Sequence, residues 1–338
     1  MRLGEVKMFF LFISGTEISK IPGLSAAGAN PDVVPLTSPA DADVIRFGFP
    51  KAIDCFPMDP EGHPTPAIIT RAAIIEADIP VCVVRAGSYL PPAPPYVETG
   101  AAFGGDPTLG PSVPEARNIF EASKHLAQNI TSHTDMVMLG ESIPGGTTTA
   151  LLALRALGVD GMVSSGGPAN PIDLKERILR DSFARLGIKS GDLADQPMRV
   201  VEELGDPMQA SVLGFISGLA PNVELILAGG TQMIAVAALL QKMDPSRRPL
   251  IATTKYVAQD ISSSFNELTA SLGLQTYIAP LDFSNSAHVG LRDYERGYVK
   301  EGVGAGGSVL YAQRLGVSVE AVIERTNSLY SQFADKNS

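Results

Sequence analysis

The sequence predicts an α/β protein with a doubly wound, mostly parallel sheet that carries helices on both faces. Short apolar runs recur along the 338-residue chain, and each one ends at Gly, Ser or Pro. The runs show no alternation of polar and apolar residues, which is typical of strands buried on both faces. The segments between many of them carry apolar residues at helical spacing, and an alternation of strand and helix is the pattern of a doubly wound fold.

The apolar runs predict strands at 9–13, 81–84, 136–139, 161–163, 224–228, 250–252 and 276–279. Helical spacing predicts helices at 116–128, 147–157, 174–186, 231–243, 262–272 and 319–333. Two stretches without periodicity, 21–39 and 90–114, contain several prolines and are expected to be irregular. The second is either a linker or a binding loop, because long loops inside compact domains are often functional. We expect one large α/β domain over 1–318, followed by a C-terminal helix and tail over 319–338.

Composition and charge exclude several classes of protein. Hydrophobic residues make up 45% and charged residues 18%, so the chain can bury a large core and is not mainly disordered. The net charge of −10 disfavours binding to nucleic acid or to an anionic membrane surface. No apolar run reaches the roughly 20 residues of a membrane span, and the run at 8–13 is better explained by a strand than by a signal peptide. Cys55 and Cys82 are too few for a disulfide framework. We therefore expect a soluble, cytoplasmic protein.

A glycine-rich segment, Gly140 to Thr149 (GESIPGGTTT), follows one predicted strand and leads into a helix. Its spacing is that of a phosphate-binding P-loop, except that Gly146 stands where the lysine belongs. Backbone N–H groups at a helix N-terminus can still hold a single phosphate. The segment therefore predicts a phosphate site and not an ATPase, with a threonine-capped turn as the alternative.

Two further glycine-rich turns, 164–167 (SSGG) and 229–232 (GGTQ), also follow predicted strands. Ligands of open parallel sheets bind outside the carboxyl ends of the strands, where such turns meet. Each turn alone is explained by packing. Together the three predict one polar crevice that takes a nucleotide or a phosphosugar.

A late segment, 300–307 (KEGVGAGG), formally matches the dinucleotide pattern GxGxxG, but it follows a polar stretch and lies near the C-terminus. Glu301 precedes backbone that a ligand can approach closely, so it is either a general base, if desolvation raises its pKa, or a solvated surface residue. His288 either contacts a ligand or lies at the surface. His63 and His125 show no metal-ligand spacing, and we expect neither a metal nor a cofactor.

The order of these motifs resembles the nicotinate-nucleotide–dimethylbenzimidazole phosphoribosyltransferase family over roughly residues 80–315. The family's GE-x-G-I-G-N-T-T-A-A is similar to 140–150, and its GGFE helix start is similar to 229–232. A glycine turn followed by a basic helical residue resembles Gly166 and Gly167 with Arg177, or with Lys175. A serine and histidine stretch resembles 284–290, and L-G-E-G-T-G-A resembles 300–305. The opening GTEISKIPGLSAAGANP (15–31) resembles the divergent archaeal and cyanobacterial branch.

The resemblance implies a homodimeric enzyme that transfers the ribose 5-phosphate of nicotinate mononucleotide to a benzimidazole, giving the α-ribotide of the cobalamin lower ligand. The family's small helical domain is expected to be reduced or absent, because a strand already begins at Phe9. The resemblance makes Glu301 the catalytic base. It implies phosphate contacts from Gly145, Gly146, Gly166, Gly167 and Arg177, and further substrate contacts from Glu141, Ser142, Thr147, Gly230, Gln232, Ser286, His288, Gly302 and Gly304.

This sequence departs from the family pattern at several of these positions. Pro144-Gly145-Gly146 replaces the G-I-G-N core, Gln232 stands where the family has Glu, and 253–255 (TTK) replaces an Asp-Gly-Phe. The departures indicate the same reaction class with another azole or a purine-like base as acceptor. The alternative is a non-catalytic protein that binds a nucleotide or a cobalamin intermediate.

Overall fold

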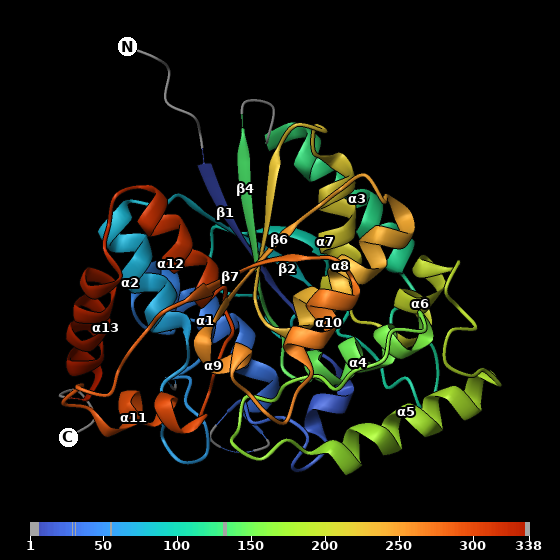
Figure 1. Ribbon diagram of the computed structural model, residues 1–338, viewed down its shortest axis with the longest axis horizontal. Coiled ribbons are helices and arrows are strands. Elements are labelled where there is room, and N and C mark those ends of the chain that lie inside the picture. Colours follow the sequence, from blue (N-terminus) through green and yellow to red (C-terminus); the bar gives the residue numbers. More distant parts are fainter. Residues whose placement is uncertain (1–6, 29, 31, 55, 131–133, 335–338) are drawn as a thin grey trace.

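The fold is a seven-stranded sheet whose strands all pair in parallel, in the order β3-β2-β1-β4-β5-β6-β7 (Figure 1). The computed structural model describes residues 7–28, 30, 32–54, 56–130 and 134–334. The strands are β1 (Lys7–Ile13), β2 (Val81–Ala86), β3 (Val97–Gly100), β4 (Met136–Ser142), β5 (Glu224–Ala228), β6 (Leu250–Thr254) and β7 (Gln275–Ala279). The predicted parallel α/β class is confirmed.

Helices cover both faces of the sheet and close a separate hydrophobic core on each (Figure 1). The first core contains residues of α3 (Ala116–Ile130), α4 (Gly146–Ala156), α5 (Ile172–Leu186), α6 (Pro197–Leu204), α7 (Pro207–Gly218), α8 (Thr231–Met243) and α10 (Phe265–Ser271). The second contains residues of α1 (Thr37–Phe47), α2 (Ala67–Ala77), α9 (Lys255–Ala258), α11 (Val289–Arg292), α12 (Ala305–Arg314) and α13 (Val319–Ala334). Short 3₁₀ helices lie at Glu17–Lys20, Val34–Leu36 and Asp293–Arg296.

The apolar run of β1 supplies both cores at once. Successive side chains of a strand point to opposite faces, so Phe10 and Phe12 enter the first core, while Phe9, Leu11 and Ile13 enter the second. All five are fully buried. A strand in this central position needs apolar residues on both faces, which explains why the run has no polar alternation.

The chain changes direction across the sheet between β1 and β4. The strands before this point extend the sheet on one side of β1, and the later strands extend it on the other. The carboxyl ends of β1 and β4 are in register, with Ile13 opposite Ser142. Such a switch point opens a crevice at the strand ends, because the connections on its two sides leave toward opposite faces. The strands β1 and β4 start near the top of Figure 1 and run down toward the middle of the view.

Several elements differ from the sequence predictions. Residues 161–163 form no strand, because Met162 exchanges hydrogen bonds with Ser264 in a loop and not with the sheet. The stretch 90–114 contains the short edge strand β3, and α1 begins inside the stretch 21–39. Helices α2 and α7 escaped prediction because they are apolar on most sides and lack a helical period. Cys55 and the tail 335–338 lie outside the described residues.

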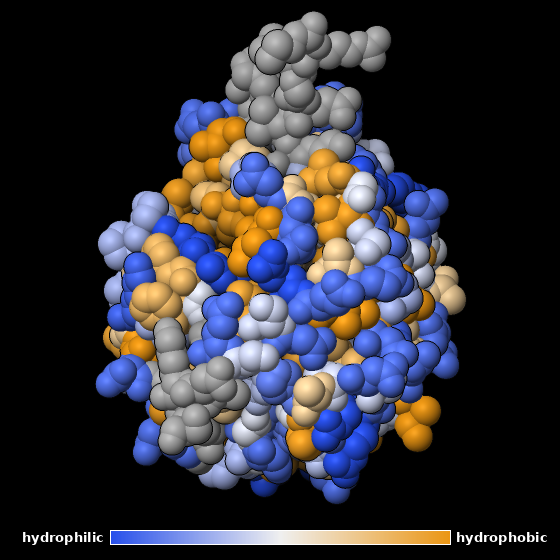
Figure 2. Space-filling view, turned by 90° about the vertical axis from the view of Figure 1, so that its left-hand side faces the viewer, coloured by the Kyte–Doolittle hydropathy of each residue, from blue (hydrophilic) through white to orange (hydrophobic). Residues whose placement is uncertain are grey.

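The C-terminal helix α13 packs on α2 and α12 at one side of the molecule. Figure 2 shows that side, where hydrophobic residues gather toward the end at which the strands begin and hydrophilic residues cover much of the rest. Within the described part of the chain, no helix combines the length and apolar character that crossing a membrane requires.

Candidate functional site

A cavity lies at the carboxyl ends of β1 and β4, at the switch point of the sheet. It is enclosed by the end of β4 with the start of α4, by residues 24–28, by residues 58–66 and by residues 299–303. Segments far apart in the sequence therefore share one site. The predicted residues that line it are Glu141, Ser142, Gly145, Gly146, Thr147, Gly166, Gln232, Glu301 and Gly302.

The start of α4 forms one wall of this cavity. Gly145 caps the helix with a φ of 82°, a left-handed conformation that glycine adopts without strain. A Cβ at this position would lie 2.7 Å from the Thr16 hydroxyl oxygen. The first N–H groups of a helix carry partial positive charge, so this wall suits an anion such as phosphate. Among the described residues that line the cavity, His63 is the sole basic side chain.

Glu301 lies across the cavity, shortly before α12. Its Oε2 accepts a hydrogen bond from the Thr254 N–H at 2.8 Å, and both carboxylate oxygens lie 3.3 Å from the Gly306 nitrogen. Burial raises the pKa of Glu301 to about 7, although hydrogen bonds from the backbone N–H groups of Gly302, Gly306 and Thr254 act in the opposite direction. A carboxyl group with this pKa can accept a proton near neutral pH.

A second carboxyl group, that of Glu141 near the end of β4, lines the same cavity. Its side chain is buried, and Oε1 has no hydrogen-bond partner among the described residues. Burial, and next the negative charge of Glu301, raise the pKa of Glu141 well above its usual range. The two glutamate segments are joined directly, because the Val303 N–H donates to the Glu141 carbonyl at 2.8 Å. The cavity therefore holds two buried glutamate carboxyl groups whose pKa values are both raised, that of Glu301 to about 7.

We expect Glu141→Gln to make stability less dependent on pH. Because the pKa of Glu141 is higher in the folded than in the unfolded protein, its protonated carboxyl group contributes stability. This contribution is fully present below the unfolded pKa of about 4.3 and is lost as pH rises through the folded pKa. Glutamine binds no such proton, so the unfolding free energy of the variant relative to wild type should rise between about pH 4 and pH 8. Urea unfolding at both pH values measures this difference. The exposed Glu267→Gln serves as control, and a parallel pH dependence of Glu141→Gln and wild type would contradict the expectation.

Sequence reasoning missed acidic residues of α1 and of the 58–66 wall. Asp41 accepts hydrogen bonds from the Thr65 hydroxyl at 2.6 Å and the Ser142 hydroxyl at 2.7 Å, and burial raises its pKa to about 6. These contacts join positions 24 and 101 residues apart in the chain. No local spacing could have revealed them.

His63 is held between two carboxylates in the 58–66 wall. Its Nδ1 lies 2.6 Å from Asp59 Oδ2, and its Nε2 lies 3.0 Å from Asp293 Oδ2. Burial would raise the pKa of Asp293, but hydrogen bonds from His63 and Arg296 lower it overall. Asp59, Glu61 and His63 are close enough to share a metal ion. Because both ring nitrogens of His63 already face carboxylates, the histidine is engaged without one.

Other predicted residues lie outside the cavity. Ser286 and His288 bond to the C-terminal helix, with 2.5 Å between Ser286 Oγ and Asn327 Oδ1 and 2.8 Å between His288 Nε2 and Ser331 Oγ. These contacts explain why neither side chain is among those that line the cavity. The predicted residues Gly167, Gly230 and Gly304 are also absent from the lining.

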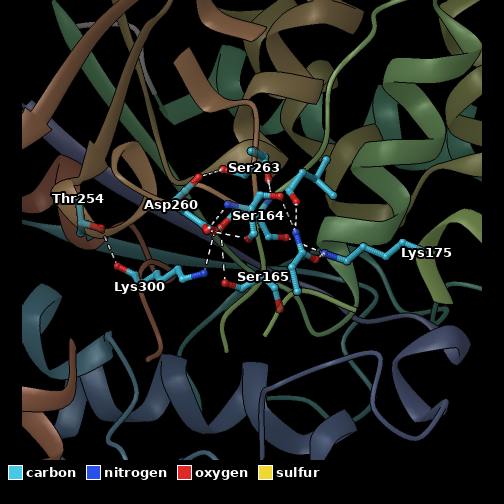
Figure 3. Close-up of polar contacts among 11 residues, drawn as sticks. Ser164, Ser165, Lys175, Thr254, Asp260, Ser263 and Lys300 are labelled. Carbon is cyan, nitrogen blue, oxygen red and sulfur yellow. Dashed lines mark hydrogen bonds and ion pairs between the residues drawn. The ribbon is translucent and has the colours of Figure 1, made fainter. Parts of the chain in front are cut away.

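The predicted phosphate contact from Arg177 is not supported by its position. Arg177 is exposed on α5, whereas Lys175, two residues earlier on the opposite face of the helix, is buried. Lys175 Nζ donates to the Ser164 carbonyl at 2.7 Å and to Asn170 Oδ1 at 2.8 Å (Figure 3). Burial, and next the charge of Lys300, lower the pKa of Lys175 to about 7. Lys175 thus stabilises the 164–167 loop through the Ser164 carbonyl and does not itself line the cavity.

Comparison with known proteins gives both a family and a fold. No protein-family model matches the sequence. A UPF0284 protein of Thermococcus kodakarensis is 47% identical over 325 residues, covering 96% of each chain. A UPF0284 protein of Pyrococcus furiosus is 46% identical, covering 96% of this chain and 98% of its own. The crystal structure of nicotinate-nucleotide-dimethylbenzimidazole phosphoribosyltransferase from Thermus thermophilus superposes with a TM-score of 0.61 at 17% identity, covering 97% of this chain and 83% of that one. This similarity demonstrates a common fold.

Proposed function

This chain belongs to the UPF0284 family, and we propose that it is a phosphoribosyltransferase that moves the ribose 5-phosphate of nicotinate mononucleotide to a benzimidazole or related base. One observation carries the proposal. A single cavity combines a helix N-terminus suited to phosphate with a carboxyl group whose pKa of about 7 suits a general base. The fold shared with the Thermus thermophilus phosphoribosyltransferase supports the same reaction class.

In the proposed reaction the phosphate rests on the N–H groups at the start of α4 and on the Ser165–Gly166 turn. One nitrogen of the acceptor azole attacks C1′ of the ribose, while Glu301 removes the proton from the other nitrogen. The bond between C1′ and the pyridinium nitrogen breaks, and its electron pair returns to nicotinate, which leaves. Attack on the face opposite nicotinate gives an α-ribotide. Because the pyridinium is already a good leaving group, positioning and one base supply the catalysis.

The rate of nicotinate release should depend on pH through Glu301. A base acts when deprotonated, so kcat should rise about tenfold per pH unit below about pH 7 and level off above about pH 8. The measurement needs an acceptor that does not itself titrate in this range. A rate that stays constant between about pH 5.5 and pH 8 would contradict the assignment of the base.

The alternative is a protein that binds a nucleotide or a cobalamin intermediate without turnover. Gln232, which lines the cavity in place of the family's Glu, favours this alternative. Calorimetry with nicotinate mononucleotide, combined with detection of free nicotinate over a panel of azoles and purines, separates the two. Nicotinate release supports the enzyme, and binding without release supports the binding protein. We further propose a cytoplasmic homodimer that binds neither nucleic acid nor membranes.

A further inference from the structure

The backbone that carries Glu301 is strained. Val299, Lys300 and Val303 have φ values of 64°, 55° and 58°. Left-handed backbone is uncommon for residues other than glycine and is a true outlier for a β-branched valine. The Lys300 N–H donates to the Tyr298 carbonyl at 2.7 Å and the Glu301 N–H to the Val299 carbonyl at 2.8 Å, closing two successive three-residue turns. Such turns with positive φ are rare and strained, so surrounding contacts must hold them in place.

Lys300 provides the contacts that hold this backbone. Its side chain is almost completely buried, and Nζ lies 2.7 Å from Asp260 Oδ2 (Figure 3). Its carbonyl accepts a hydrogen bond from the Thr254 hydroxyl at 2.6 Å, and the Thr254 N–H donates to Glu301. Lys300 is therefore anchored by its ammonium group at one end and by its carbonyl at the other. The adjacent Glu301 shares the second anchor.

Asp260 connects this segment to the 164–167 loop. The same oxygen that meets Lys300 also accepts a hydrogen bond from the Ser164 hydroxyl at 2.7 Å, and the following residues Ser165 and Gly166 line the cavity (Figure 3). Asp260 Oδ1 accepts from the N–H and hydroxyl of Ser262, which fixes the carboxylate. Two walls of the cavity thus converge on a single carboxylate oxygen.

We propose that Lys300 and Asp260 are positioning residues, whose buried ion pair holds the left-handed backbone that directs Glu301 into the cavity and ties it to the 164–167 loop. This inference rests on the proposed function for its kinetic consequence. Its structural consequence, the position of Glu301, is independent of the proposed function. In this arrangement Lys300 acts through the backbone conformation that its side chain stabilises. Asp260 holds both Lys300, next to the proposed base, and Ser164 of the 164–167 loop.

A comparison of Lys300→Ala with Lys300→Gly tests the inference, because both variants remove the ammonium group but glycine alone adopts positive φ without strain. We expect Lys300→Ala to lower kcat by about 10- to 100-fold, since a displacement of about 1 Å can cost that much. Lys300→Gly should retain a kcat at least several-fold above that of Lys300→Ala. Asp260→Asn should lower kcat and also raise KM for the mononucleotide, because it weakens the Ser164 contact too. A kcat for Lys300→Gly at or below that of Lys300→Ala would overturn the inference.

Crystal structures of the same variants keep this test separate from the test of the reaction. If the wild-type protein releases no nicotinate with any base, the proposed function fails, and the structures alone decide the positioning role. The inference predicts that the hydrogen bond between the Thr254 N–H and the Glu301 carboxylate is lost in Lys300→Ala and kept in Lys300→Gly. If Lys300→Ala does not fold, the same loss is expected in Asp260→Asn. An unmoved Glu301 in Lys300→Ala or in Asp260→Asn would overturn it.

Discussion

Glu301→Gln is expected to lower the rate of nicotinate release by about 10²- to 10⁴-fold, the usual contribution of a positioned general base. Glutamine has nearly the same shape and can still accept a hydrogen bond from the Thr254 N–H, but it cannot take up the proton of the acceptor azole. The mononucleotide should therefore still bind. Single-turnover release of nicotinate measures the rate, and calorimetry measures the binding.

The control for this variant is Glu320→Gln, which makes the same chemical change at an exposed position of α13. It should release nicotinate at the wild-type rate. If Glu301→Gln also does so, Glu301 is not the base. If Glu301→Gln fails to bind the mononucleotide as well, the residue serves binding and the catalytic assignment is again wrong.

Gly145→Ala is expected to weaken binding of the mononucleotide by roughly 10- to 100-fold, which corresponds to the loss of one or two charge-assisted hydrogen bonds to the phosphate. The added Cβ meets the Thr16 hydroxyl at 2.7 Å, and the left-handed φ of 82° becomes strained. The cap of α4 must then shift, and with it the N–H groups proposed to hold the phosphate. Calorimetric titration with nicotinate mononucleotide measures the change in Kd.

Gly187→Ala is the matched control for the backbone strain. Gly187 ends α5 with a φ of 65°, and an added Cβ would have no atom within 4 Å. Both variants should lose stability because alanine disfavours positive φ. Only Gly145→Ala should lose affinity. Equal affinities in the two variants would remove α4 from the phosphate site.

Much of the fold could be predicted from sequence because central strands are buried on both faces. The run at 9–13 feeds both cores, so its apolar character is continuous and unmistakable. The edge strand β3 is partly exposed and lies in a proline-rich stretch, so it lacks this signal. Helices packed on most sides, such as α7, lose the amphipathic period by which a helix is recognised.

The candidate site could be predicted where glycine turns follow strands, because the carboxyl ends of parallel strands must meet. This rule, together with the family resemblance, predicted that Gly145, Gly146 and Glu301 share one site, and all three line the cavity. It could not choose between Lys175 and Arg177, which requires knowing which face of α5 packs inward. It also could not find Asp41 or His63, whose partners lie far away in the chain.

A crystal structure of the protein with bound nicotinate mononucleotide tests the central claim most directly. The account predicts the phosphate within hydrogen-bond distance of the first N–H groups of α4, with the Glu301 carboxylate facing the side of C1′ opposite nicotinate. A mononucleotide bound away from the β1–β4 switch point, or with its ribose turned from Glu301, would contradict the account.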